Sequence, residues 1–500
     1  MKKRMKSLIC LPMSGLLLLP AVSCSQSGQR DGKTETDPPV TADPEPVPEQ
    51  DVPAETEAEE IDANLPDKTF GGEQIMFLDW RNPAYDKYYT SREIYAEELD
   101  GTLINDAVFT RNAKLEDLLD VKIAETKLED CASVARNSVK ADEAYYNVVM
   151  PYMNETIGLA TDGLLLDLKT VPWIDLSRGW WDQRANKNLL IADKLFITTG
   201  DIAILDNECT LCLYFNKEML RDRNLENPYE LVREHRWTLD KLREMTAGVT
   251  NDADGDGQLT KKDVWGLSIS HNTPMCMYFG AGERIVDWNE EGTLDFCLGS
   301  ARSVDVFDKI IEVCCDTSML SAHTVGDTLY ASVLPMFNEG RVMIVTWNLS
   351  SLADTRETEF EFGLLPMPLY DEAQEEYNHM ISTELVSSVS VPVTCPDIEV
   401  TGAVLEAMAS LSVSTLTAAY YDNALKTRYI RDEESGDMLD IIFSTRVYDI
   451  GYIYNWGSSA TLISSLYGAK STNIASMWAK FEKKARKDLE KAHETFAALE

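Results

Sequence analysis

Two apolar runs separated by an acidic segment, within residues 194–217, constrain the fold of this chain more than any other stretch. Residues 196–199 and 211–215 are rich in β-branched and aromatic side chains, which is typical of buried strands in a mixed or parallel sheet. The polar residues between the two runs are Asp201, Asp206, Asn207 and Glu208. We therefore expect one strand to end at a polar, ligand-facing bend and another to begin after it.

A βαβ rhythm is predicted for the region that precedes this stretch. The expected strands cover residues 73–80, 121–125 and 146–150. A helix capped by Asn105 or Asp106 should connect the first strand to the second. Such an order predicts a largely parallel sheet, in which ligands lie outside the carboxyl ends of the strands.

The N-terminus has the pattern of a lipoprotein export signal. Basic residues precede an apolar run, residues 8–20, that is too short to span a bilayer and is followed by small residues and Cys24. We expect residues 1–23 to be removed and the thiol of Cys24 to carry a diacylglycerol anchor. The alternative is an ordinary cleaved signal with a chance cysteine.

Residues 24–66 are dominated by Pro, Asp, Glu and Thr and have almost no large apolar side chains. Such a segment cannot bury enough surface to offset its ordering entropy. We expect it to be a disordered tether that holds the folded part clear of the membrane.

The formal net charge of −38 limits the partners of this chain. No basic patch or polybasic run follows the signal, which argues against nucleic acid and against an anionic lipid surface. The acidity also argues against an anionic substrate.

Cysteine and histidine patterns suggest no catalytic metal. Cys209 and Cys212 form a CxxC, but they lie in an expected strand without a second ligand pair or a helix N-terminus. We interpret them as buried free thiols rather than a redox or zinc site. The five histidines show no metal-binding spacing.

Residues 252–263, DADGDGQLTKKD, match an EF-hand-type calcium loop. The expected Ca²⁺ ligands are Asp252, Asp254, Asp256, the backbone carbonyl of Gln258, and Asp263. A strand rather than a helix should come after the loop, over residues 264–270, so we predict one structural ion and not a paired sensor. The alternative is an acidic turn without an ion.

The order of several patterns resembles the extracellular solute-binding proteins of sugar ABC transporters, of family 1 type. The residues that carry this resemblance are Lys194, Leu195, Tyr214, Asn216 and Lys217 in a first crossing segment, Gly340, Met343 and Trp347 in FNEGRVMIVTWNLSSL, and Pro366. The resemblance runs in the same order over most of residues 68–500 and includes a returning strand over residues 382–393.

The resemblance implies a periplasmic-binding-protein-like α/β fold, with two α/β lobes joined by a hinge of crossing strands. The length of the chain after the tether also exceeds one typical domain. Lobe 1 would comprise residues 67–200 plus 384–447, and lobe 2 residues 201–383 plus 448–500.

Sugar-binding proteins of this kind stack Trp and Tyr on the C–H faces of sugar rings and bind hydroxyls with carboxylates and amides. The ligand-binding residues that the resemblance implies are Trp80, Trp181, Asp206, Asn207, Tyr278, Trp347 and Trp456. For Trp181 and Trp456, interior packing is the open alternative, and Trp180 and Trp181 cannot both face one ligand if the segment is extended.

Taken together, these patterns predict a lipid-anchored, monomeric binding protein on the extracellular face of the cell membrane. It would capture a carbohydrate of oligosaccharide size for an ABC permease and would not be an enzyme. Two alternatives stay open. One is a surface glycan-binding lipoprotein without a transporter, and the other is a carbohydrate-active hydrolase, which needs two carboxyls about 5–10 Å apart.

Overall fold

The computed structural model describes residues 63–83, 90–326, 333–430 and 432–499. The predicted signal, Cys24 and nearly all of the predicted tether lie outside the described residues. The described part of the chain, from residue 63 onward, forms one compact unit.

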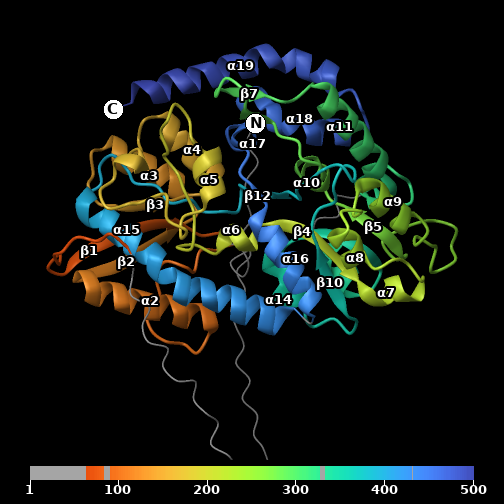
Figure 1. The fold of residues 1–500 in the computed structure, drawn as a ribbon, viewed down its shortest axis with the longest axis horizontal. Helices are drawn as coiled ribbons and strands as arrows, with labels where there is room; N and C mark the ends of the chain where they lie inside the picture. Colours follow the sequence, from red (N-terminus) through yellow and green to blue (C-terminus); the bar gives the residue numbers. More distant parts are fainter. Residues whose placement is uncertain (1–62, 84–89, 327–332, 431, 500) are drawn as a thin grey trace, which may run out of the picture. The chain divides into compact units, whose positions relative to one another are not determined.

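The first sheet is parallel and has the order β2-β1-β3. Its strands are β1 (Glu73–Trp80), β2 (Val121–Leu128) and β3 (Val148–Met150). The helices that follow or cover them are α2 (Leu103–Leu119), α3 (Cys131–Lys140), α4 (Met153–Thr161), η1 (Leu168–Thr170), α5 (Gln183–Asn188) and α15 (Ile398–Ser412). These elements lie on the left of Figure 1. The predicted βαβ rhythm is confirmed.

The predicted cap of α2 is wrong. The helix begins at Leu103 after Thr102, so Asp106 lies inside the first turn. The Asp106 carboxylate accepts the backbone N–H groups of Asp100 and Gly101 and therefore fixes the preceding loop instead of capping the helix.

The second sheet is mixed and has the order β10-β4-β9-β5-β8. Its strands are β4 (Leu211–Asn216), β5 (Trp265–Ile269), β8 (Leu320–Ser321), β9 (Val342–Asn348) and β10 (Phe362–Leu365). β4 is antiparallel to both neighbours, whereas β5 is parallel to both of its neighbours. All six residues of β4 are buried, as the apolar run predicts for a central strand.

Helices surround the second sheet on the right of Figure 1. They are α7 (Lys217–Asp222), α8 (Pro228–Arg233), α9 (Leu239–Ala247), α10 (Thr273–Gly280), α11 (Ala301–Cys314), α12 (Ala322–Val325), α13 (Val333–Asn338), η2 (Leu349–Ser351), α14 (Leu352–Thr355) and α16 (Glu433–Ser444), with a small hairpin of β6 (Val286–Trp288) and β7 (Leu294–Phe296). α16, which the predicted division assigns to lobe 1, packs on β10, where the Ser435 hydroxyl accepts the N–H of Leu364.

Two segments connect the sheets and run antiparallel to each other. Isolated bridges pair Thr198 with Val389 and Thr210 with Ile381. The expected strands over residues 196–199 and 382–393 are therefore single bridges rather than ladders, and the expected bend is a one-turn helix, α6 (Leu205–Glu208). A short parallel pair, β11 (His379–Met380) with β12 (Arg446–Val447), completes the connection.

One helical segment, Ile398–Lys426, is long and apolar enough to cross a membrane. However, 67% of its most apolar stretch is buried inside the protein. It is a core element of the described chain. It continues α15 through two π-helical stretches, η3 (Val413–Thr417) and η4 (Ala419–Tyr429).

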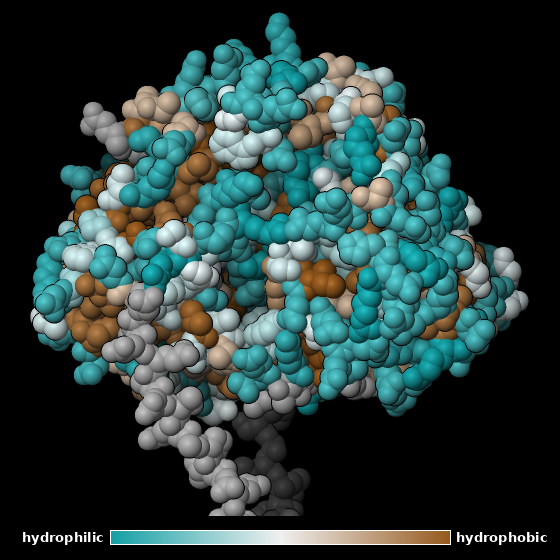
Figure 2. Space-filling model, in the orientation of Figure 1, coloured by the Kyte–Doolittle hydropathy of each residue, from teal (hydrophilic) through white to brown (hydrophobic). Residues whose placement is uncertain are grey.

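The C-terminal helices are α17 (Ile450–Tyr454), η5 (Trp456–Ser458), α18 (Ser459–Gly468) and α19 (Ile474–Ala498). α19 contacts α4 near the first sheet and α11 near the second, and it crosses the top of Figure 1. The ring of Phe496 lies 4.9 Å from Phe196, and the ring of Trp478 lies 4.9 Å from Phe296. The face shown in Figure 2 is mostly hydrophilic, with scattered apolar patches.

The described cysteines are all free, and Cys209 and Cys212 are buried. The CxxC is therefore a pair of buried thiols in and before β4, as expected.

Candidate functional site

A pocket of about 350 Å³ lies where the segments that connect the two sheets meet. We call it the junction pocket. Its walls come from residues 179–182, the segment that contains α6, the π-helical η3 and η4, α16 and β12. The side chains that line it are Trp180, Trp181, Asp182, Asp201, Asp206, Asn207, Thr417, Tyr420, Tyr421, Asp440, Phe443, Ser444 and Arg446.

Gly200 brings two walls of the junction pocket into contact. It forms a backbone bridge with Trp181, and a Cβ at this position would lie 2.2 Å from the carbonyl oxygen of Trp180. No side chain fits there, so only glycine permits this approach of the two backbones. The contact places Asp201 beside the segment that carries Asp182.

Asp182 uses its two carboxylate oxygens in different ways. Oδ1 accepts the N–H groups of Arg184 and Ala185 and so caps α5. Oδ2 accepts from Nη2 of Arg446 at 2.6 Å and from the hydroxyl of Tyr448 at 2.9 Å. The cap fixes the orientation in which Asp182 meets its partners.

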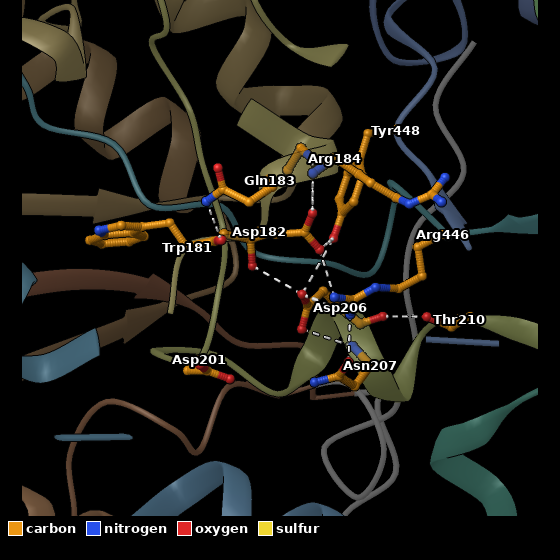
Figure 3. A network of polar contacts seen from close by, with 12 residues as sticks. Trp181, Asp182, Gln183, Arg184, Asp201, Asp206, Asn207, Thr210, Arg446 and Tyr448 are labelled. Atoms are coloured by element: carbon orange, nitrogen blue, oxygen red, sulfur yellow. Dashed lines mark hydrogen bonds and ion pairs between the residues drawn. The ribbon is translucent and has the colours of Figure 1, made fainter. Parts of the chain in front are cut away.

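Asp206 is fully buried on α6 at the centre of this network (Figure 3). Its Oδ2 accepts from Nη1 of Arg446 at 3.1 Å and from the hydroxyl of Thr199 at 3.3 Å, and its Oδ1 accepts the N–H of Asn207. Burial raises the pKa of Asp206, and the charge of Arg446 opposes that rise. The site therefore holds this carboxylate by direct charge pairing in a dry environment.

Arg446 joins the carboxylates of the network from β12. Its terminal nitrogens donate to Asp182, Asp206 and the side-chain oxygen of Asn207, while Nε is buried without a partner. Burial acts to lower the pKa of Arg446, but Tyr448 and the surrounding aspartates raise it overall. The guanidinium is therefore permanently charged here.

Aromatic side chains form the opposite wall of the pocket. Tyr420 and Tyr421 lie on η4, and the ring of Tyr421 is 5.6 Å from that of Phe443 on α16. The Tyr421 hydroxyl donates to Asp440. π-helical turns are rare and often mark functional sites. This one turns two adjacent tyrosines toward a single pocket.

A second cluster of buried carboxylates lies at the carboxyl end of β1. Its members are Asp79, Glu93 and Glu208, and Arg92 forms an ion pair with Glu208. Burial raises the pKa of Asp79 to about 6 and that of Glu93 well above its ordinary value. One carboxylate oxygen each of Glu93 and Glu208 is buried without a hydrogen-bond partner.

The structure brings three of the predicted ligand residues together at the junction pocket: Trp181, Asp206 and Asn207. The indole of Trp181 is buried in the core beside the first sheet, and its N–H donates to Glu406 at 2.9 Å. Trp181 thus supports the wall from inside, while Asp206 and Asn207 belong to the polar network.

Trp80 and Trp347 lie at the ends of strands, outside the junction pocket. Trp80 is buried at the end of β1, with its ring 4.0 Å from that of Tyr152. Trp347 is partly buried near the end of β9, and its indole N–H donates to Ser351. Their roles in ligand binding stay predictions.

Tyr278 and Trp456 are packed elsewhere. Tyr278 is fully buried in α10, with its hydroxyl 2.9 Å from that of Ser303. Trp456 stacks on Tyr454 at 4.6 Å and lines a separate pocket beneath α19. Neither side chain reaches the junction pocket in this structure.

Sequence reasoning missed Asp182, Arg446, Tyr448 and the tyrosines of η4. A signal for two of them existed, because Arg446 and Tyr448 are two residues apart and an extended segment places such residues on one side. Their partner Asp182 is 264 residues from Arg446 along the chain, and nothing local in the sequence joins them.

The predicted calcium loop places three carboxylates together. Oxygens of Asp252, Asp254 and Asp256 lie within 4.8 Å of one another on the surface. Hard cations such as Ca²⁺ prefer such oxygen ligands, so these residues fit the ion. Asp263 is turned to the backbone, where it accepts N–H groups of Thr260 and Ala253, and these bonds lower its pKa. Its role as a ligand stays a prediction.

No protein-family model matches the chain, and a search of curated proteins found no match. Solved structures do match. A cyclic α-maltosyl-1,6-maltose binding protein from Arthrobacter globiformis is 13% identical with a TM-score of 0.54, covering 86% of this chain and 99% of its own. A cyclo/maltodextrin-binding protein complexed with maltotetraose is 16% identical with a TM-score of 0.53, covering 85% of this chain and 97% of its own.

A sugar transporter protein from Rhizobium etli, in an open conformation, is 13% identical with a TM-score of 0.52, covering 85% of this chain and 100% of its own. At these low sequence identities the similarity shows a shared fold only. The shared fold extends over nearly the whole length of each solved chain. The two sheets, the connecting segments and this likeness agree: the chain has the two-lobed, periplasmic-binding-protein-like α/β fold of sugar-binding proteins.

Proposed function

We propose that this chain is an extracellular binding protein that captures a carbohydrate in the junction pocket and delivers it to an ABC permease. The observation that carries the proposal is the pocket itself. A buried polar network of Asp182, Asp206, Asn207 and Arg446 faces the aromatic wall of η4 and α16.

This combination suits a sugar better than an apolar ligand. Carboxylate and amide oxygens accept hydroxyl protons, and aromatic faces pack against C–H groups. Tyr421 and Phe443 supply the faces, while Asp206 and Asn207 supply acceptors that their neighbours hold in place.

The position of the pocket supports a binding role in which the two lobes close on the ligand. Its walls come from the connecting segments, from α16, which packs on β10 of the second sheet, and from η3 and η4, which pack on α2 beside the first sheet. A ligand bound there would contact both lobes and favour the arrangement in which they are closed. Solved proteins of this fold are described as binding maltotetraose and cyclic α-maltosyl-1,6-maltose, which supports an oligosaccharide as the ligand class.

The proposal includes the cell-surface anchor. The export signal and Cys24 support a chain held by lipid at the extracellular face of the membrane, and the acidic segment after Cys24 would act as the tether. We propose that the protein performs this task as a monomer.

The test is a panel of linear and cyclic oligosaccharides, screened by the rise in melting temperature that a bound ligand produces. Small-angle scattering of the best ligand complex should show contraction of the protein. Affinity should fall about tenfold or more in Tyr421→Ala, whereas Tyr145→Ala, an exposed tyrosine outside the pocket, should bind as wild type.

Two outcomes would overturn the proposal. If no carbohydrate raises the melting temperature, the ligand class is wrong. If the best ligand is cleaved, as release of reducing sugar would reveal, the hydrolase alternative replaces it. A pair of permease genes beside the gene for this chain would favour the proposal over a glycan-binding role without a transporter.

A further inference from the structure

We infer that the junction pocket selects carbohydrates that carry a protonated amino group, that is amino sugars, over neutral and acidic ones. This inference rests on the proposed function and adds the ligand's charge to it.

The junction pocket has an excess of negative charge. Four carboxylates line it, from Asp182, Asp201, Asp206 and Asp440, whereas Arg446 is the one cation among the described lining residues. Lys426 lies next to the pocket and pairs with Asp440 at 3.4 Å. Among the lining side chains and Lys426, carboxylates outnumber cations by two, and low-dielectric walls strengthen the field of such charges.

The terminal nitrogens of Arg446 are engaged by the protein's own side chains. Its terminal nitrogens already bind Asp182, Asp206 and Asn207. It therefore has no charge left for a further carboxylate, and a ligand with its own carboxylate would meet only repulsion.

Asp201 is the carboxylate without a cation. Its Oδ1 accepts from the hydroxyl of Thr417 at 2.9 Å, and no ion pair joins it to any residue in the described part of the chain. Burial raises its pKa to about 6, with smaller contributions from Asp206 and Asp182 and an opposing one from Arg446. An ammonium group bound here would replace the lost hydration with a charge-assisted hydrogen bond.

The aromatic wall suits a cation as well. Nζ of Lys426 lies 4.6 Å above the ring of Tyr421, and the guanidinium of Arg446 lies 5.9 Å from that of Phe443. Faces of this wall thus already attract positive charge. Tyr420 lines the same pocket with its ring, and its hydroxyl is buried without a hydrogen-bond partner.

Two matched ligands test the inference: the tetramer of glucosamine and its fully N-acetylated counterpart, compared by titration calorimetry at about pH 6.5. The wild type should bind the amino form about tenfold to a hundredfold more tightly. Asp201→Asn keeps the shape of the side chain but removes its charge, and it should bring the ratio of the two affinities close to one. Asp437→Asn, an exposed aspartate on α16 that pairs with Arg233, is the control and should keep the ratio.

The outcomes separate this inference from the proposed function. If the N-acetylated or another neutral oligosaccharide binds at least as tightly as the amino form, the charge selection is overturned while carbohydrate capture stands. A preference that persists unchanged in Asp201→Asn also overturns it, because the acetyl group alone would then explain the difference. If no tetramer and no member of the neutral panel binds, the proposed function fails first.

Discussion

Arg446 and Asp182 form a buried ion pair, with 2.6 Å between Nη2 and Oδ2, although 264 residues separate them in the sequence. The pair joins β12 to the N-terminus of α5 beside the first sheet. Because Arg446 also binds Asp206, one guanidinium holds two carboxylates that would otherwise repel each other.

Arg446→Met should therefore destabilise the protein by about 3–5 kcal/mol, because it leaves two buried carboxylates without their cation. Arg486→Met is the matched control. Arg486 pairs with Asp295 and Glu482 on the surface, so its loss should cost less than about 1 kcal/mol. Urea unfolding of both variants at neutral pH measures the difference, and equal losses would contradict the role assigned to Arg446.

The raised pKa of Asp201 makes a prediction for stability against pH. Its value of about 6 in the folded protein lies above the ordinary 3.8, so the folded state holds this proton more strongly than the unfolded state. The stability that the group contributes is complete below about pH 4 and is lost as the pH rises through about 6. The full difference is at most about 3 kcal/mol.

Asp201→Asn removes this titration, and its side-chain oxygen can still accept from Thr417. The variant should therefore be more stable than wild type at pH 7 but not at pH 4. Chemical unfolding at several pH values between 4 and 8 gives the two curves. Parallel curves would show that Asp201 does not titrate in this range.

The calcium loop predicts a dependence of stability on the ion. An ion that binds the folded state alone raises the melting temperature by mass action, so excess chelator should lower it. The double variant Asp254→Ala, Asp256→Ala should abolish the effect of calcium, because it removes two of the three clustered carboxylates. Sugar affinity should change little, because the loop does not line the junction pocket. A melting temperature that stays unchanged in excess chelator would argue against the calcium site.

The secondary structure was predictable wherever local pattern decides it. The apolar runs at residues 73–80 and 211–215 are β1 and β4, and the stretch after the calcium loop is β5. The connecting segments were predicted less well. Residues 196–199 and 382–393 are extended but meet each other at the single bridge of Thr198 with Val389, and Ser390 forms one further bridge with Val149 of β3.

The site was only half predictable for a related reason. Asp206 and Asn207 come after an apolar run in the sequence and could be recognised as site residues. Arg446 and Asp182 could not, because they become neighbours only when the fold brings β12 and α5 together. Aromatic side chains alone did not identify the residues that line the pocket. Tyr278 and Trp456 are large side chains in a two-lobed protein with extensive cores, and both are buried by packing in α10 and beneath α19.

The anchor can be tested independently of the fold. Wild-type protein should sediment with membranes, since a diacylated cysteine buries many more methylenes than the single chain that gives marginal binding. Cys24→Ala should be released into the soluble fraction, while Cys395→Ala, a cysteine of the folded part, should stay with the membrane. Equal sedimentation of wild type and Cys24→Ala would exclude this anchor.

Titration calorimetry with the best oligosaccharide, on wild type and Asn207→Ala, tests the central claim most directly. Asn207 lines the junction pocket and binds Arg446, but it is less buried than Asp206, so its loss should leave the protein folded. We predict a loss of affinity of about tenfold to a few hundredfold, because the variant loses a hydrogen bond to the ligand together with the charge-assisted bond that orients Arg446. An Asn207→Ala protein that is folded and binds the sugar as tightly as wild type would show that the ligand is captured elsewhere.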